Sequence, residues 1–244
     1  MEDTDAQRSE KRFEEGIING LNWLGIAWDE GPYRQSERRD LYKTHLQKLL
    51  DAGLAYYCYC TKEELDAERE ARMAQGLAPI YGGHCRSRDA NGRPAQVIRF
   101  KTPPEEDIKF KDLIRDAVSF NTRVIGDFVI AKDLESPLYN FAVVVDDEDM
   151  NITHVIRGED HISNTPTQIL LQRALGFRDV HYAHLPLILA PDRSKLSKRY
   201  LETSLDEYRK RGFLTDALVN FIALLGWHPA RDREILSRDE LIAE

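Results

Sequence analysis

Two lysines lie three residues apart in the segment Lys195-Leu196-Ser197-Lys198-Arg199, directly after a predicted turn at residues 191–194. Paired, flexible cations on such a loop suit the stabilisation of negative charge on a transferring nucleotide phosphate, a reaction that needs no covalent protein nucleophile. Clusters of lysine and arginine are also common on solvated surfaces. These five residues therefore leave two interpretations open, a phosphate site and an ordinary charged surface.

All three cysteines of the chain lie close together in sequence, as Cys58, Cys60 and Cys85, with Tyr81 and His84 beside the third. Zinc in a structural site takes four sulfur, nitrogen or occasionally oxygen ligands, and a helical segment over 62–75 would bring the two ligand pairs together. Three reduced cysteines without a metal are the alternative, because Cys-x-Cys is a less common zinc spacing than Cys-x-x-Cys. We expect zinc.

The composition is that of a globular protein. With 244 residues, 42% of them hydrophobic and 31% charged, the chain can bury a core. No segment approaches the roughly 20 apolar residues that cross a bilayer, and the charged residues 1–5 do not resemble a signal peptide, so we expect a cytoplasmic protein without a membrane partner. The net charge of −8 argues against general adhesion to nucleic acid but leaves a local basic face open.

Helical and extended patterns alternate along the chain. Apolar residues recur at helical spacing over 13–24 and 41–49, and the second run follows a predicted N-cap at Ser36. Short strands punctuated by turns are predicted at 96–100, 108–113, 117–120, 127–131 and 138–145. Further predictions are a strand over 152–156, a helix that opens at residues 164–166, a strand over 181–189 and a mostly helical tail through 217–225.

These elements predict an α/β domain that is split by an antiparallel or mixed insertion and followed by the beginning of a helical domain. Ligands of open α/β sheets bind beyond the carboxyl ends of the strands, where residues 157–161 and the Lys195 loop would both fall. The sequence holds neither a Gly-x-Gly-x-x-Gly nor a Walker A pattern. A dehydrogenase or a P-loop phosphotransferase therefore has little support.

Several segments, in order, resemble glutamyl-tRNA synthetases of the bacterial type, which are class I aminoacyl-tRNA synthetases. Residues 195–199 resemble the KMSKS signature in its KLSKR form, residues 2–5 resemble the end of R-I-E-D-T-D, and residues 31–38 resemble G-P-Y-x-Q-S-E-R. Residues 139–147 and 154–161 also match closely, and residues 223–227 resemble the start of the stem-contact region. The resemblance implies a Rossmann-like parallel sheet, split by an α+β insertion that holds the tRNA acceptor end.

The same resemblance implies site residues. Lys195 and Lys198 would be catalytic, and ATP would be bound by Lys195, Leu196, Ser197, Lys198, Arg199 and Asp160. Glutamate would be bound by Glu2 through its ammonium group, by Tyr139, and by Arg157, whose planar guanidinium suits a carboxylate.

Each glutamate-binding residue also has a purely structural interpretation. Arg157 would form an ion pair with Glu159 or Asp160, Tyr139 would be a plain aromatic strand residue, and Glu2 a mobile terminal carboxylate.

The implied activity is the two-step reaction of a glutamate-tRNA ligase. The α-carboxylate of L-glutamate attacks the α-phosphate of ATP with Mg²⁺, which gives glutamyl-adenylate and pyrophosphate. The terminal ribose hydroxyl of tRNA(Glu) then takes the acyl group. Positioning and charge neutralisation would supply most of the catalysis, and we expect a monomer.

The resemblance also bears on the fourth zinc ligand. Zinc-bearing members usually place a histidine two residues after the third cysteine, but Ser87 stands there in this sequence. Related glutamyl-queuosine tRNA(Asp) synthetases use a tyrosine four residues before that cysteine, which is the relation of Tyr81 to Cys85. We therefore expect Cys58, Cys60, Tyr81 and Cys85 as ligands, with His84 as the rival fourth ligand.

The expected domain parts are an incomplete first part of the catalytic domain at 1–54, the acceptor-binding insertion at 55–142, the second catalytic part at 143–190, and the KLSKR loop with the start of the stem-contact domain at 191–244. The family places its HIGH motif before the segment that residues 2–5 resemble, so we expect a fragment that lacks this motif and the anticodon-binding domain and is inactive alone. The alternatives are a glutamyl-queuosine tRNA(Asp) synthetase and a non-catalytic protein that binds the tRNA acceptor end or is regulatory.

Overall fold

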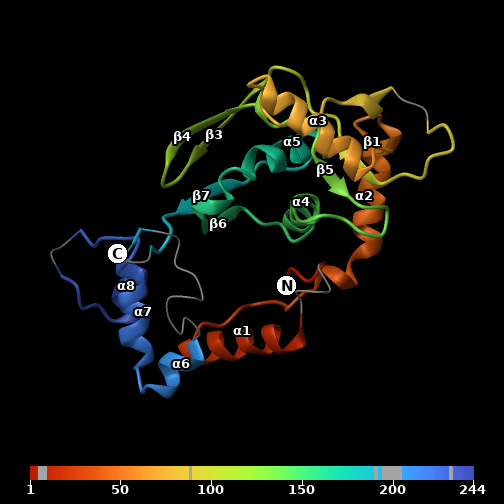
Figure 1. Ribbon diagram of the computed structural model, residues 1–244. Coiled ribbons are helices and arrows are strands. Elements are labelled where there is room, and N and C mark those ends of the chain that lie inside the picture. The colour runs from red at the N-terminus through yellow and green to blue at the C-terminus, as the bar shows by residue number, and fades with distance from the viewer. Residues whose placement is uncertain (5–9, 88–89, 190–191, 194–204, 231–232) are drawn as a thin grey trace.

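The computed structural model describes residues 1–4, 10–87, 90–189, 192–193, 205–230 and 233–244 (Figure 1). The helices are α1 (Lys11–Leu24), α2 (Arg39–Asp51), α3 (Lys62–Ala74), α4 (Tyr139–Asp149), α5 (Thr165–Leu175), α6 (Leu205–Lys210), α7 (Thr215–Leu224) and α8 (Arg238–Ala243). The strands are β1 (Ala55–Cys58), β2 (Val97–Phe100), β3 (Asp107–Asp112), β4 (Asp116–Asn121), β5 (Val129–Ala131), β6 (His154–Gly158) and β7 (His181–Leu185).

The strands form two sheets. One is antiparallel, in the order β1-β2-β5, and the other has the order β4-β3-β7-β6. In the second sheet, β7 runs parallel to β6, with Ile156 opposite Ala183, and parallel to β3, with Asp112 opposite Tyr182. The β3–β4 hairpin, which belongs to the expected insertion, therefore extends the parallel sheet that carries residues 157–161 (Figure 1).

One hydrophobic core joins both sheets to α2, α4 and α5. Tyr42 and Leu46 of α2 and Phe141 of α4 are fully buried in it, together with Ile98 of β2 and Ile130 of β5. Because all these elements bury apolar side chains against one another, the expected insertion and the expected catalytic part share a core.

The strand predicted at 138–145 is wrong, because this segment begins α4. The run Val143-Val144-Val145 has the β-branched composition of a strand, but its burial follows a helical period: Phe141, Ala142, Val144 and Val145 are buried. Packing of this face against α2 and α5 outweighs the small cost of valine in a helix, which is a few tenths of a kcal/mol per residue.

The N-cap predicted at Ser36 is also wrong. Ser36 lies in a short 3₁₀ helix, Gln35–Glu37, and α2 begins at Arg39 without a side-chain cap. The Ser36 hydroxyl instead donates to the Asp3 carboxylate at 2.6 Å, and its backbone N–H donates to the same side chain at 2.8 Å. Ser36 therefore fixes the N-terminal segment rather than the helix.

The other local predictions hold with shifted ends. The helix predicted to open at residues 164–166 is α5, with Pro166 in its first turn, and α3 covers nearly all of the expected helix at 62–75. The strand expected over 181–189 ends at Leu185, and the one expected over 152–156 begins at His154.

The C-terminal helices pack against α1 (Figure 1). Arg238 of α8 donates to the carbonyl oxygens of Leu24 and Gly25 at the end of α1, at 2.6 and 2.8 Å. In the described part of the chain, none of the helices has the length and apolar character required to cross a bilayer.

Candidate functional site

The carboxyl end of β6 positions the first candidate residue, Arg157. The strand ends at Gly158, and residues Glu159–His161 form a 3₁₀ turn that leads toward α5. A Cβ atom at Gly158 would lie 2.6 Å from Asp160 Oδ1, so a larger residue there would displace the Asp160 side chain. This tight turn sets Arg157 beside the first residues of α5.

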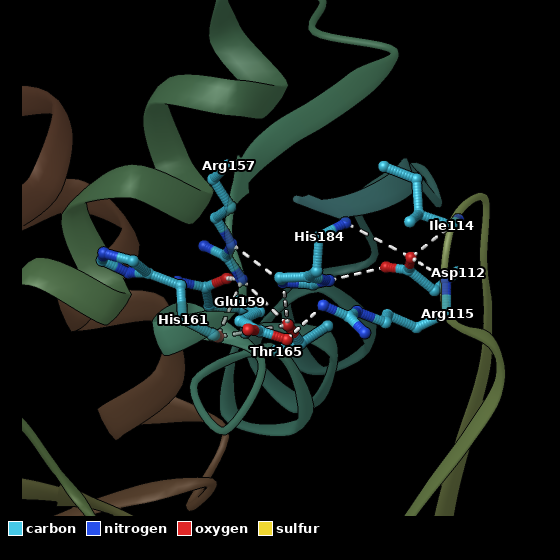
Figure 2. A network of polar contacts seen from close by, with 9 residues as sticks. Asp112, Ile114, Arg115, Arg157, Glu159, His161, Thr165 and His184 are labelled. Carbon is cyan, nitrogen blue, oxygen red and sulfur yellow. Dashed lines mark hydrogen bonds and ion pairs between the residues drawn. The ribbon is translucent and has the colours of Figure 1, made fainter. Parts of the chain in front are cut away.

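Four groups fix the Arg157 guanidinium. Nε donates to His184 Nε2 at 3.2 Å, and Nη2 donates to Thr165 Oγ1 at 2.9 Å and to the His161 carbonyl at 3.4 Å (Figure 2). Nη2 also donates to Gln168 Oε1 at 2.8 Å. Within the described part of the chain these bonds use Nε and Nη2, which leaves Nη1 as the nitrogen available to a ligand. A held guanidinium with one unused edge suits an incoming carboxylate.

The suggested ion pair between Arg157 and Glu159 is absent among the described residues. The Glu159 carboxylate pairs with Arg115 at the turn of the β3–β4 hairpin and also accepts from the Leu187 backbone N–H at 3.1 Å. Glu159 therefore links the hairpin to the loop after β7, and no ion pair joins Arg157 to a carboxylate of the described residues.

Tyr139, the first residue of α4, lies beside the same turn. Its hydroxyl is 3.3 Å from His161 Nδ1, and the two rings meet edge to face with centroids 5.7 Å apart. Burial and the nearby Glu2 carboxylate raise the pKa of Tyr139, while Arg157 and Gln168 oppose that rise. Tyr139 is therefore a neutral hydroxyl that faces the guanidinium.

Two carboxylates complete this cluster. Burial raises the pKa of Glu2, against the opposing attraction of His161 and Arg157. Burial also raises the pKa of Asp147 to about 6, with repulsion from Asp146 adding to the rise and Arg157 opposing it. The structure thus brings Glu2, Tyr139 and Arg157, the three residues expected to bind glutamate, close enough for their charges to interact.

The lysine loop, Lys195, Leu196, Ser197, Lys198 and Arg199, lies outside the described residues. Asp160, the other residue expected to bind ATP, is exposed in the turn directly after β6. Its position beyond the carboxyl end of a parallel strand is the usual position for a ligand-binding residue in an α/β sheet.

The three cysteines form one buried cluster, and their ligand atoms all lie within 4.8 Å of one another. Tyr81 Oη joins it at 3.6 Å from Cys58 Sγ and 3.5 Å from Cys60 Sγ, and Cys60 Sγ is 3.5 Å from Cys85 Sγ. Ligands of a tetrahedral zinc with Zn–S bonds of about 2.3 Å are roughly 3.8 Å apart. The donor set and its spacing therefore fit zinc.

The rival ligand His84 is not part of the cysteine cluster. Its Nε2 is 3.0 Å from Glu68 Oε1, and its ring meets Tyr81 edge to face at 5.8 Å. The geometry favours Tyr81 as the fourth ligand. Burial, with the neighbouring thiols adding to it, raises the pKa of Cys60 to about 11 in the absence of a metal.

Comparison with known proteins places the chain in a family. The family model described as tRNA synthetases class I (E and Q), catalytic domain, matches residues 1–244. The chain belongs to this family of class I aminoacyl-tRNA synthetases. The family match and the solved relatives below confirm the predicted class I α/β fold.

The relatives are ligases. The chain is 51% identical over 251 residues to the glutamate-tRNA ligase of Aquifex aeolicus, which covers 99% of this chain and 53% of that protein. It is also 51% identical over 258 residues to that of Carboxydothermus hydrogenoformans, with 99% and 54% covered. A crystal structure of a glutamate tRNA ligase from Elizabethkingia meningosepticum, in complex with its amino acid, matches with a TM-score of 0.86 at 37% identity, over 100% of this chain and 57% of that one.

The chain therefore spans about half the length of the curated relatives that it matches.

Sequence reasoning missed the residues that support the guanidinium. His184 and Asp112 are fully buried, and Thr165 and Gln168 come from α5. A buried histidine in a predicted strand and an aspartate at a hairpin turn were the available signals, but only the structure shows that they meet.

Proposed function

We propose that this chain carries the glutamate-activating site of a glutamate-tRNA ligase. Its substrates are L-glutamate, ATP with Mg²⁺ and the acceptor end of tRNA(Glu). Support comes from ligases about half identical to the chain throughout its length. It also comes from the cluster of Glu2, Tyr139 and Arg157 at the end of β6.

The main support for the proposal is the position of the Arg157 guanidinium. Its contacts to His184, Thr165 and Gln168 hold the group at the carboxyl end of a parallel strand. Nη1 then donates to one carboxylate of glutamate, and the Tyr139 hydroxyl donates beside it. The Glu2 carboxylate accepts from the ammonium group. Such a site recognises both ends of an acidic amino acid by charge and geometry.

Activation needs no nucleophile from the protein, because the α-carboxylate of glutamate itself attacks the α-phosphate of ATP. Positioned cations stabilise the charge that develops on the phosphate. Lys195 and Lys198 take this role in the proposal, with Leu196, Ser197 and Arg199 in the same loop and Asp160 beside the nucleotide. Residues 55–142 hold the acceptor end of the tRNA, whose terminal ribose hydroxyl takes the acyl group.

Titration with L-glutamate tests the amino-acid site. We expect saturable binding by calorimetry, and at least about ten-fold weaker binding for Arg157→Ala, which loses a charge-assisted contact. Arg178→Ala is the matched control: this exposed arginine pairs only with Glu148 among the described residues, so affinity should change less than about two-fold. Absence of saturable binding, or equal affinities for both variants, would overturn the proposal.

Glutamate-dependent exchange between ATP and pyrophosphate tests activation itself. Exchange by the chain, followed by charging of tRNA(Glu) and not of tRNA(Asp), supports the ligase. Preferential transfer to tRNA(Asp) would instead establish the glutamyl-queuosine tRNA(Asp) synthetase, and tRNA binding without glutamate binding would establish a non-catalytic acceptor-binding protein.

The cysteine cluster holds a structural zinc ion in this proposal, with Cys58, Cys60, Cys85 and Tyr81 as ligands. Cys58 lies at the end of β1 and Cys85 in the turn at residues 84–86, so bound zinc would cross-link these two segments. The backbone N–H of Tyr59 donates to Cys85 Sγ at 3.4 Å, a contact that orients the sulfur. Metal analysis of the purified protein should give about one zinc per chain; no zinc, with three freely titratable thiols, would sink the assignment.

A further inference from the structure

We infer that Asp112 and His184 are positioning residues for Arg157. They form a buried pair that fixes the guanidinium so that its Nη1 edge faces the ligand, and the pair is anchored on the β3–β4 hairpin. The inference deepens the proposed function, on which it rests for the identity of the ligand as glutamate.

The three side chains form one linear chain of contacts. His184 Nδ1 is 2.6 Å from Asp112 Oδ2, and His184 Nε2 accepts from Arg157 Nε at 3.2 Å, so the imidazole lies between the carboxylate and the guanidinium (Figure 2). Both Asp112 and His184 are 0% exposed. Bulk solvent does not reach the imidazole, so its nitrogens depend on protein partners: Nδ1 on Asp112, and Nε2 on Arg157 and on Thr165 Oγ1, which lies 3.2 Å away.

The contacts require one tautomer of His184. The Nε–H of Arg157 can only donate, so His184 Nε2 must present its lone pair. The imidazole proton then lies on Nδ1 and is donated to Asp112. A neutral histidine locked in this form gives the guanidinium a fixed acceptor, in the way that buried carboxylates orient histidines in other sites.

Asp112 is well placed to hold the proton in that position. Its Oδ1 atom accepts from the backbone N–H groups of Ile114 and Arg115, both at 2.9 Å, and from that of His184 at 3.2 Å. Burial disfavours the charged form, but these hydrogen bonds outweigh it and keep the pKa of Asp112 below its ordinary value. One carboxylate oxygen therefore builds the hairpin turn, and the other orients His184.

The substitution Asp112→Asn distinguishes the roles of the two carboxylate oxygens. The amide oxygen can keep the three backbone contacts, whereas the NH₂ group must face His184 Nδ1 and donate to it. His184 would then carry its proton on Nε2, where it can no longer accept from the Nε–H of Arg157 and has Thr165 Oγ1 as its nearby acceptor. We expect L-glutamate affinity to fall about ten-fold while ATP affinity changes less than about two-fold.

Two substitutions of His184 test which of its contacts, the one with Arg157 or the one with Asp112, affects ligand binding. The carbonyl of Gln in His184→Gln can reach the position of Nε2 and accept from Arg157, whereas the amide of Asn in His184→Asn replaces only the Nδ1 donor to Asp112. Asn should therefore weaken glutamate binding about ten-fold and Gln less than about three-fold. Arg115→Ala, which breaks the ion pair between the hairpin and Glu159, is the control and should retain affinity within about two-fold.

Calorimetry with L-glutamate and with ATP measures these affinities, and ¹⁵N NMR of the imidazole reads the tautomer without any ligand. A proton on Nδ1 in the unsubstituted protein, its transfer to Nε2 in Asp112→Asn, and the order Gln above Asn at position 184 support the inference. Unchanged glutamate affinity despite the tautomer switch would overturn the inference alone. Absence of glutamate binding by the unsubstituted protein would overturn the proposed function, and the positioning role with it.

Discussion

The Tyr42 hydroxyl on α2 donates to the Asp146 carboxylate on α4 at 2.8 Å, across 104 residues of sequence. Gln35 Nε2 and Arg38 Nε donate to the same carboxylate at 2.9 and 2.8 Å. Asp146 is 8% exposed and Tyr42 is fully buried. These contacts fix the position of α4, the helix whose first residue is Tyr139, relative to α2.

Substitution of this carboxylate should destabilise the fold. Asp146→Ala leaves the buried Tyr42 hydroxyl and the Arg38 guanidinium without their shared acceptor, so the free energy of unfolding should fall by about 3 kcal/mol. Asp149→Ala removes only the exposed partner of Arg38 and should cost less than about 1 kcal/mol. Urea denaturation followed by circular dichroism measures both; equal losses would contradict the role of Asp146.

The fourth metal ligand can be identified by two substitutions. Tyr81→Phe removes the oxygen that lies among the thiols and should weaken zinc binding at least about ten-fold, measured by competition with a chelator. His84→Ala removes an exposed ring that contacts Glu68 and should leave zinc affinity within about two-fold. The opposite order would assign the metal to His84.

Asp127 should make the protein sensitive to acid. Its side chain is 1% exposed and accepts from Tyr56 Oη at 2.5 Å, the Thr102 backbone N–H at 2.9 Å and Arg86 Nε at 2.6 Å. Burial opposes the charge, but these donors, led by Arg86, hold the pKa of Asp127 below its usual value.

A lowered carboxylate pKa stabilises the folded state at every pH above the unfolded value of about 3.9, and this contribution is lost as the pH falls further. The difference in unfolding free energy between the unsubstituted protein and Asp127→Asn should therefore be about 2 kcal/mol at pH 6 and shrink as the pH falls below about 4. Urea curves at a series of pH values check this; a constant difference would show that the charge is not responsible.

Asp147 should change the pH dependence of stability in the opposite direction to Asp127. Its pKa is raised to about 6, first by burial, so the folded protein binds the proton more tightly than the unfolded chain does. Stability is then lost as the pH rises from about 4 to about 6. Asp147→Asn should raise the unfolding free energy by about 2 kcal/mol at pH 7.5 and change it little at pH 4. Thermal denaturation at the two pH values measures this. If Asp147→Asn is less stable than the unsubstituted protein at pH 7.5, the raised pKa of Asp147 is contradicted.

Local signals predicted those parts of the fold that depend on neighbours in sequence. The start of α5 at residues 164–166 and the strands β3 and β4 are read from a few adjacent residues. The prediction of a strand at 138–145 was wrong because its valine composition favours a strand. Contacts with α2 and α5, which are distant in sequence, stabilise a helix instead.

The candidate site divides in the same way. Arg157 and Tyr139 stand out through the motifs around them, and the structure places both beside the turn at residues 159–161. His184 and Asp112 carry no such motif, and 72 residues separate them. Their contact follows from β7 lying between β3 and β6, a strand order that periodicity alone does not specify.

The pairing of β3 with β7 also constrains how the protein is assembled during its synthesis. Because translation proceeds from the N-terminus, β3 leaves the ribosome well before β7, and only β4 can pair with it in that interval. The Asp112 carboxylate likewise cannot contact His184 until the 72 residues that follow it have been synthesised. The sheet that carries Arg157 can therefore close only after β7 has emerged. Until then the edge of the β3–β4 hairpin is exposed and can pair with other strands.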